Sequence, residues 1–235
     1  MTYPKMIIFD YGHTLLYEPG CDTLRGEKAL FNYVKENKYN ITAKQADDFS
    51  QDIFEQIGIA RKHGLEIHER QFQRFLFEYL GLELSISLEK AEQVFWDALS
   101  LGAVMPNADK MLDYINEKGI RSAVISNIGW SGKALCERLD RLLPQNRFEF
   151  VIASSDYMFR KPNRLLFANE VWYCGDNPQA DVEGSAQVGI YPVWYDNDTE
   201  KGIKDRSWQT TPKCEHLYIK EWDEMIEVLE KLKND

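Results

Sequence analysis

Short, continuous apolar runs alternate with helical patterns along most of the chain. Residues 6–9 are Met-Ile-Ile-Phe and end at Asp10, which is typical of a strand that is buried on both faces of a sheet. Similar runs predict further strands over 120–126, 148–153, 171–174 and 190–194. Patterns with a helical period predict helices over 107–118, 131–142, 162–169, 178–187 and 221–232. This alternation predicts an α/β fold with a doubly wound parallel sheet and right-handed crossovers.

The pattern changes between about residues 22 and 99, where apolar positions recur with the 3.6-residue period of amphipathic helices. Four helices are expected, with Thr42 and Ser87 as N-caps and Gly64 at a C-terminal end. No strand signal interrupts this region, so a smaller, all-helical domain is predicted as an insertion into the α/β domain. The expected boundaries are 1–16 and 101–235 for the α/β core and 17–100 for the helical domain.

Composition and charge exclude several classes of protein. The chain has 235 residues, of which 44% are hydrophobic and 28% charged, so it is neither disordered nor collagen-like. Its formal net charge of −10 repels nucleic-acid backbones and anionic membranes. The four cysteines share no Cys-x-x-Cys spacing, which favours reduced thiols. Because there is neither a signal-peptide pattern nor an apolar stretch near the roughly 18 residues of a membrane span, we expect a cytoplasmic protein without nucleic-acid or membrane partners.

Polar residues of complementary kinds follow four of the predicted strands. Asp10 and Asp176 each come directly after a strand, Ser126 and Asn127 lie at the end of another, and Lys161 lies in a loop that follows a fourth. In open parallel sheets, ligands bind at the carboxyl ends of the strands. Carboxylate and phosphate oxygens together suit Mg²⁺. A carboxylate at such a position can also act as a nucleophile and form an aspartyl-phosphate.

The motifs around these residues resemble those of the haloacid dehalogenase (HAD) superfamily of hydrolases. The matching segments are 8–15 (IFDYGHTL), 124–127 (VISN), 154–156 with 160–162 (SSD and RKP), and 175–184 (GDNPQADVEG). They occur in the order of the family's four motifs, each at the end of a predicted strand. The resemblance extends over the whole chain outside the helical insertion. The resemblance implies a Rossmann-like core and a mobile helical cap that closes over the site, excludes water and selects the substrate.

The resemblance also implies a role for each matching residue. The implied catalytic residues are Asp10 as the nucleophile, Ser126, Lys161 and, as the nearest titratable group for proton transfer, His13. The implied substrate-binding residues are Tyr11, Gly12, Ser126, Asn127 and Lys161. The implied Mg²⁺ site is formed by Asp10, the Gly12 carbonyl, Asp176 and Asp181. The expected protein is therefore a Mg²⁺-dependent phosphatase that acts on a small phosphorylated metabolite, as a monomer or a homodimer.

Gly12 departs from the family pattern. Family phosphatases usually place a second Asp two residues after the nucleophile, where it protonates the leaving oxygen and then activates water. Loss of a positioned acid or base typically costs about 10²–10⁴ in rate. One alternative is therefore a weakened relative that only binds a phosphorylated ligand or a partner. Another is a metal-independent haloacid dehalogenase, because the Tyr11-Gly12 pair resembles the sequence of that subgroup. Either His13 or a water takes the proton role, or His13 only completes the turn.

Two further points concern the crossover and the cap. Lys161 and Asp176 are only 15 positions apart, where the resemblance implies roughly ten more, so the helical crossover is either unusually compact or lacks residues in this chain. The helical region carries basic side chains that either contact the substrate or are simply solvated, namely Arg61, His63, His68, Arg70 and Arg74.

Overall fold

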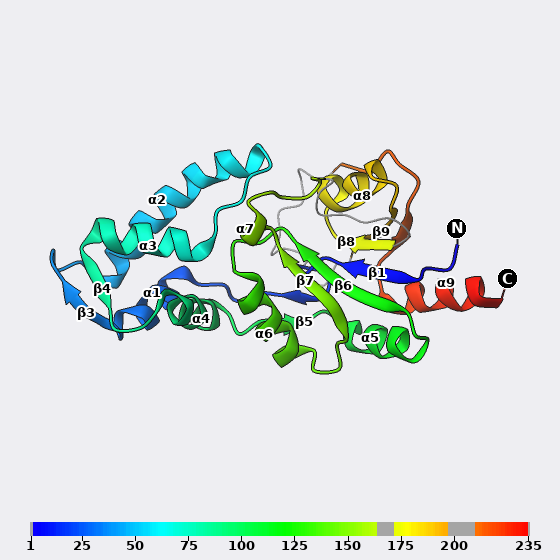
Figure 1. The fold of residues 1–235 in the computed structure, drawn as a ribbon, viewed down its shortest axis with the longest axis horizontal. Helices are drawn as coiled ribbons and strands as arrows, with labels where there is room; N and C mark the ends of the chain where they lie inside the picture. The colour runs from blue at the N-terminus through cyan, green and yellow to red at the C-terminus, as the bar shows by residue number, and fades with distance from the viewer. Residues whose placement is uncertain (1, 164–171, 197–209, 235) are drawn as a thin grey trace.

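The structure is a computed structural model that describes residues 2–163, 172–196 and 210–234. Figure 1 shows an elongated molecule, with a sheet and its flanking helices in one half and a group of helices in the other. The helix expected over 162–169 and most of the crossover to Asp176 lie outside the described residues.

A parallel sheet forms the centre of the larger half (Figure 1). In sheet order its six strands are β10 (Leu217–Ile219), β9 (Tyr191–Tyr195), β8 (Trp172–Gly175), β1 (Met6–Phe9), β6 (Arg121–Ser126) and β7 (Phe148–Ala153). Every neighbouring pair is parallel. The predicted α/β fold with a doubly wound parallel sheet is therefore confirmed. The edge strand β10 was not predicted, because three residues are too few to show a strand pattern.

The central strand β1 is buried on both faces, as its continuous apolar run predicts. Ile7 and Phe9 belong to the larger of two apolar clusters, where the Phe9 ring lies 5.6 Å from the ring of Trp222. Met6 and Ile8 belong to the smaller cluster on the opposite face. The elements around the sheet are α5 (Ala108–Glu117), α6 (Gly132–Leu142), α7 (Ser154–Tyr157), the π-helix η2 (Pro178–Glu183), α8 (Gly184–Gln187) and α9 (Trp222–Asn234).

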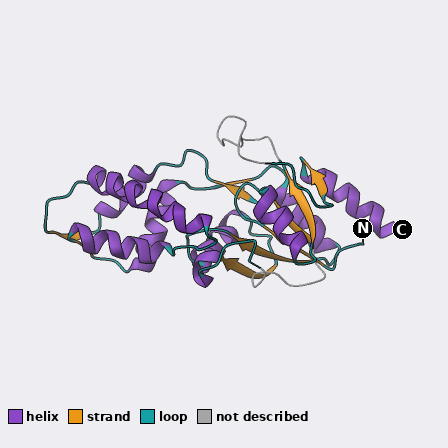
Figure 2. Cartoon of the chain, turned by 90° about the horizontal axis from the view of Figure 1, so that it is seen from above, coloured by secondary structure: helices purple, strands orange, loops and turns teal. Residues whose placement is uncertain are grey.

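Four helices form the second half of the molecule, and Figure 2 shows them extending away from the sheet. They are α1 (Thr23–Phe31), α2 (Ala43–Lys62), α3 (Glu69–Leu80) and α4 (Leu88–Leu99). The predicted caps are confirmed: Thr42 and Ser87 accept hydrogen bonds from the first turns of α2 and α4, and Gly64, with a φ of +78°, follows the end of α2. Among the described residues, no helix combines the length and apolar character that a membrane span requires.

The prediction of an all-helical insertion is wrong in one respect. The short strands β3 (Val34–Asn37) and β4 (Leu82–Leu84) pair antiparallel within it. Strands of three or four residues are too short to leave an alternating pattern in the sequence. A second short pair, β2 (Leu16–Tyr17) and β5 (Ala103–Val104), joins the two chain segments that enter and leave the helical region. The division into 1–16 with 101–235 and 17–100 stays a prediction, and this pair lies at its boundaries.

Three acidic side chains from different helices influence one another inside the helical half. Glu27 on α1 is only 2% exposed, and its Oε2 has no hydrogen-bond partner among the described residues. Burial, together with the nearby carboxylates of Glu69 and Asp47, raises the pKa of Glu27 to about 8. The folded protein therefore holds a proton on Glu27 at neutral pH.

We expect the free energy of unfolding to fall as pH rises through this range. Between the pKa of an unfolded glutamate, about 4.3, and the folded value of about 8, the native state keeps a proton that the unfolded chain has lost. Raising the pH therefore favours unfolding. In urea titrations, Glu27→Gln should reduce the stability difference between pH 5 and pH 8 by roughly 2–4 kcal/mol. Exposed Glu36→Gln is the control, and an unchanged pH dependence in the Glu27 variant would contradict the assignment.

Candidate active site

The carboxyl ends of three neighbouring strands bring the predicted site residues together. Asp10 follows β1, Ser126 is the last residue of β6, and Asp176 follows β8. These strands are adjacent in the sheet, so the residues that follow them share one edge (Figure 1). A cavity of about 330 Å³ lies at this edge. All the site residues predicted from the sequence line it, namely Asp10, Tyr11, Gly12, His13, Ser126, Asn127, Lys161, Asp176 and Asp181.

The ammonium group of Lys161 is buried at the base of this cavity, with its side chain 1% exposed. Its Nζ lies 2.8 Å from Oδ1 of Asp10 and 2.7 Å from Oδ1 of Asp181. It also donates to the hydroxyl of Tyr173, at 2.5 Å, and to the carbonyl of Ile125, at 3.1 Å. Burial lowers the pKa of Lys161, but the two carboxylates raise it by more, so the net shift is upward and the group stays charged.

Asn127 holds the backbone of Lys161 in place. Its Oδ1 accepts a hydrogen bond of 2.6 Å from the Lys161 N–H, and its Nδ2 donates one of 3.2 Å to the Lys161 carbonyl. The second motif therefore fixes the third through one side-chain amide. Asn127 also lines the cavity. Its contact with substrate stays a prediction, whereas its contact with the Lys161 backbone is observed.

Asp181 is engaged on both carboxylate oxygens. Oδ1 faces Lys161, and Oδ2 accepts a hydrogen bond of 3.0 Å from the backbone N–H of Asn177. A Cβ on Gly175 would lie 2.4 Å from the Asp181 carboxyl group, so a glycine is required at the end of β8. Burial raises the pKa of Asp181 to about 7, against the opposing charge of Lys161.

The three carboxylates fit a divalent cation. Asp10, Asp176 and Asp181 each offer a buried oxygen, and these atoms lie within 4.8 Å of one another. Clustered carboxylate oxygens are the donors that Mg²⁺ prefers, and a phosphate oxygen would complete such a set. Since Asp181 also binds Lys161 and the Asn177 N–H, the geometry favours Asp10 and Asp176 as direct ligands, with Asp181 beside them.

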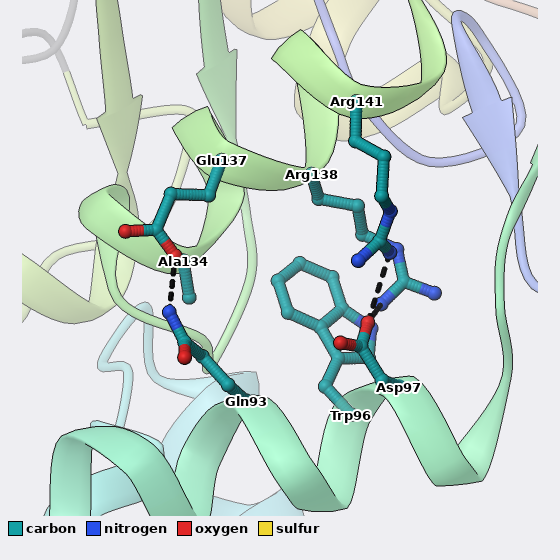
Figure 3. A pocket seen from close by; sticks show the side chains of 7 residues that line it. All are labelled: Gln93, Trp96, Asp97, Ala134, Glu137, Arg138 and Arg141. Carbon is teal, nitrogen blue, oxygen red and sulfur yellow. Dashed lines mark hydrogen bonds and ion pairs between the residues drawn. The ribbon is translucent and has the colours of Figure 1, made fainter.

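A buried polar network joins Asp10's neighbour to the helical half of the molecule. The Tyr11 hydroxyl donates to Oε1 of Glu18 at 2.5 Å, Trp96 Nε1 donates to the same oxygen at 3.2 Å, and Arg138 Nη2 donates to Oε2 at 2.9 Å. Figure 3 shows Trp96 on α4 facing Arg138 on α6, where the guanidinium carbon lies 4.3 Å from the ring. Burial raises the pKa of Tyr11 well above its usual range. Sequence reasoning missed Glu18, because Arg138 lies 120 positions away.

A second buried glutamate, Glu66, connects the loop between α2 and α3 to the third motif. Its side chain is fully buried; Oε1 accepts from Arg61 Nε at 2.8 Å, and Oε2 accepts from Ser154 Oγ at 3.3 Å and pairs with Arg160. The Glu66 N–H also donates to the carbonyl of Met158 at 2.8 Å. The helical half is therefore held against the loop that carries Lys161.

Glu92 on α4 makes a similar contact with Ser131, four residues after the second motif. It accepts hydrogen bonds of 2.7 Å from both the N–H and the hydroxyl of Ser131, and one of 2.7 Å from Arg70 Nε. Ser131 is the N-cap of α6, directly after the segment that ends β6. This second buried carboxylate therefore fixes the helical half to the other side of the cavity.

The basic residues of the helical region serve structural roles. Arg61 pairs with Glu66, Arg70 with Glu92 and exposed Arg74 with Glu78, while His68 lies 3.3 Å from Asp156, and His63 is exposed at the end of α2. Within the described part of the chain, none of these five residues lines the cavity. Of the two alternatives for these side chains, contact with substrate therefore has no support in this arrangement.

Comparisons with known proteins agree with the fold. No family model matches the chain. It is 23% identical over 215 residues to the ribulose-1,5-bisphosphate 5-phosphatase of Halopiger xanaduensis, covering 83% of this chain and 85% of the relative. Among solved structures, a HAD phosphatase from Thermococcus onnurineus has a TM-score of 0.61 at 19% identity, covering 97% of this chain and 98% of the other.

Two more solved structures are similar over nearly the whole chain. A 2-haloacid dehalogenase from Pseudomonas syringae pv. Tomato has a TM-score of 0.59 at 19% identity, covering 98% of this chain and 99% of the other. The HAD-hydrolase YfnB of Bacillus subtilis, bound to magnesium, has a TM-score of 0.53 at 18% identity, covering 97% and 99%. The chain therefore has the fold of the HAD-superfamily hydrolases, which confirms the resemblance carried by its four motifs.

Removing the Lys161 ammonium should destabilise the protein, because it leaves Asp10 and Asp181 buried without a counter-charge. We expect Lys161→Met to lower the free energy of unfolding by about 3–5 kcal/mol in urea titrations with a chelator present. Adding Asp181→Asn should recover part of this loss. The exposed pair Lys35–Glu83 supplies the control, since Lys35→Met should cost much less than Lys161→Met. Equal losses in the two lysine variants would contradict the buried charge network.

Proposed function

We propose that the protein is a Mg²⁺-dependent phosphatase that acts on a small phosphorylated metabolite through an aspartyl-phosphate on Asp10. The observation that supports this best is the position of Asp10, whose Oδ1 touches the buried Lys161 ammonium while its carboxylate adjoins those of Asp176 and Asp181. The similarity to a relative named as a phosphatase, and to a HAD phosphatase structure, favours the same reaction. The cytoplasmic location and the monomeric or homodimeric state stay predictions.

In the proposed reaction, a carboxylate oxygen of Asp10 attacks phosphorus and the bond to the leaving oxygen breaks. The Ser126 hydroxyl and the backbone N–H groups of Tyr11 and Gly12 hold the phosphoryl oxygens. Lys161 pairs with Asp10 and offsets negative charge as the reaction proceeds. Bound by Asp10, Asp176 and the Gly12 carbonyl beside Asp181, Mg²⁺ would supply further positive charge against the phosphate oxygens. Water then attacks the aspartyl-phosphate and regenerates Asp10.

Position 12 is a glycine, so no aspartate is present there to protonate the leaving group. His13 is the titratable residue next to it, lines the cavity, and has a φ of +56°, a conformation that non-glycine residues adopt mainly where the surroundings impose it. We assign the proton transfer to His13 or to a water in the cavity. Substrates whose leaving group needs no proton, such as acyl phosphates, should therefore react best.

Asp10→Asn tests the nucleophile. It should abolish phosphate release from acetyl phosphate and from sugar phosphates, measured with Mg²⁺ and with a chelator, while circular dichroism shows a retained fold. Exposed Asp109→Asn is the matched control and should keep full activity. Retained turnover in the Asp10 variant would contradict the mechanism. Halide release from 2-chloropropionate that a chelator does not affect would favour a dehalogenase, and binding of phosphorylated ligands without any turnover would favour a non-catalytic relative.

Gly12→Asp should restore the acid that the family pattern places here. A Cβ at Gly12 would meet no atom within 4 Å, so the side chain can be accommodated. We expect phosphate release from an alkyl phosphate to rise about tenfold or more, with a smaller gain for acetyl phosphate, because only the alkoxide needs a proton to leave.

Gly58→Asp, at an equally unobstructed glycine on α2, is the control for the added charge. His13→Asn should lower alkyl phosphate turnover more in the parent than in the Gly12→Asp background. If Gly12→Asp gives no gain for the alkyl phosphate, the missing aspartate is not what limits the reaction.

A further inference from the structure

A second cationic side chain, Arg160, lines the same cavity as Asp10 and Lys161. Its Nη1 pairs with Oε2 of Glu66, and its side chain is 22% exposed. The other edge of the guanidinium, formed by Nε and Nη2, has no partner among the residues that the structure describes. This edge is the fork that binds carboxylate or phosphate oxygens through two parallel hydrogen bonds.

Lys161 cannot serve an additional anion in the same way. Its Nζ already contacts two carboxylates, a tyrosine hydroxyl and a backbone carbonyl. An ammonium group has three protons to donate, so these contacts occupy all of them. An anionic substrate group that lies beyond the phosphoryl position can therefore bind Arg160, whose guanidinium still has N–H groups available as hydrogen-bond donors.

The charge around Arg160 also favours an anion. Arg160 and Arg61 share the single carboxylate of Glu66, so the three side chains together carry one net positive charge. Glu66 is fully buried and fixes Nη1, which limits the orientations that the guanidinium can adopt. A side chain held in place in advance loses less conformational entropy when it binds a ligand.

We propose that Arg160 binds a second anionic group of the substrate, either a carboxylate or another phosphate, and so determines which phosphorylated metabolites react. This inference rests on the proposed phosphatase function. The cavity of about 330 Å³ limits the substrate to a small molecule. The class is therefore a small phosphate ester or acyl phosphate that carries a further negative charge.

The test compares matched substrates that differ in the second anion. 3-Phosphoglycerate and glycerol 3-phosphate share a carbon frame and differ by a carboxylate against a hydroxymethyl group. Fructose 1,6-bisphosphate and fructose 6-phosphate form a second pair, in which the additional anion is a phosphate. In the parent, kcat/KM should favour the substrate with the second anion by about 10–100-fold in at least one pair, the range that charged hydrogen bonds supply. In Arg160→Gln this ratio should fall towards one, mainly through KM.

Two further variants separate substrate binding from a structural role. Arg74→Gln removes an arginine that pairs with a glutamate on the surface, and it should leave the ratio unchanged. Glu66→Gln keeps the Arg160 guanidinium, so its ratio should stay well above that of Arg160→Gln. If Arg160 only connects the two halves of the molecule, both the Glu66 and the Arg160 variants will reduce activity on all four substrates alike, which would overturn the proposal.

Binding measurements keep this inference separate from the phosphatase proposal. Calorimetry with the Asp10→Asn protein and its Arg160→Gln derivative uses the same four compounds. Suppose that the parent turns over none of the four compounds, but the compound with the second anion binds more tightly and loses this advantage in Arg160→Gln. The phosphatase proposal then fails and the anion site stands. If turnover occurs without a preference that depends on Arg160, the anion site fails and the phosphatase stands. A parent that shows neither preferential turnover nor preferential binding overturns the anion site as well.

Discussion

The burial of the Lys161 ammonium between two carboxylates is the constraint on which the rest of the site depends. A buried charge is tolerated only when it is fully paired and hydrogen-bonded, and here Asp10, Asp181 and Tyr173 satisfy it together. Asp10 lies 151 positions from Lys161 in the sequence, whereas Tyr173 lies 12 positions away. Only a parallel sheet that places β8, β1 and β6 side by side brings them to one point, so the charge network and the strand order require each other.

The two halves of the molecule are joined by buried carboxylates rather than by apolar contact alone. Glu66 and Glu92 extend from the helical half to Arg160 and Ser131, on the loops that carry the third and second motifs. Separating these groups would expose the carboxylates, so any movement of the helical half must exchange these hydrogen bonds for hydrogen bonds to water. The Glu66 contact also fixes one edge of Arg160, so the proposed recognition of a second anion depends on the position of the helical half.

The sequence predicted the parts of this structure that local pattern and chemistry determine. The run before Asp10 and the polar residues at Ser126 and Asp176 are local signals, and they located the central strands and the edge where the candidate site lies. Short elements such as β10 were missed, because a few residues show no period. The contacts of Glu66 with Arg160, 94 positions away, could not be predicted, because only the tertiary fold brings such partners together.

The charges around the cavity favour the binding of a cation at the candidate site. Glu18 is neutralised by Arg138, which leaves the single Lys161 facing the carboxylates of Asp10, Asp176 and Asp181. Counted with all three carboxylates ionised, the cluster has a net charge of −2 at the position proposed for the phosphate, within a protein of net charge −10, and the pKa of about 7 lets Asp181 bind a proton near neutral pH. A divalent cation brings this cluster to neutrality, and the positive group around Arg160 then supplies the remaining attraction. In the proposed reaction, a bound divalent cation would therefore offset the negative charge of the site that the phosphate must approach.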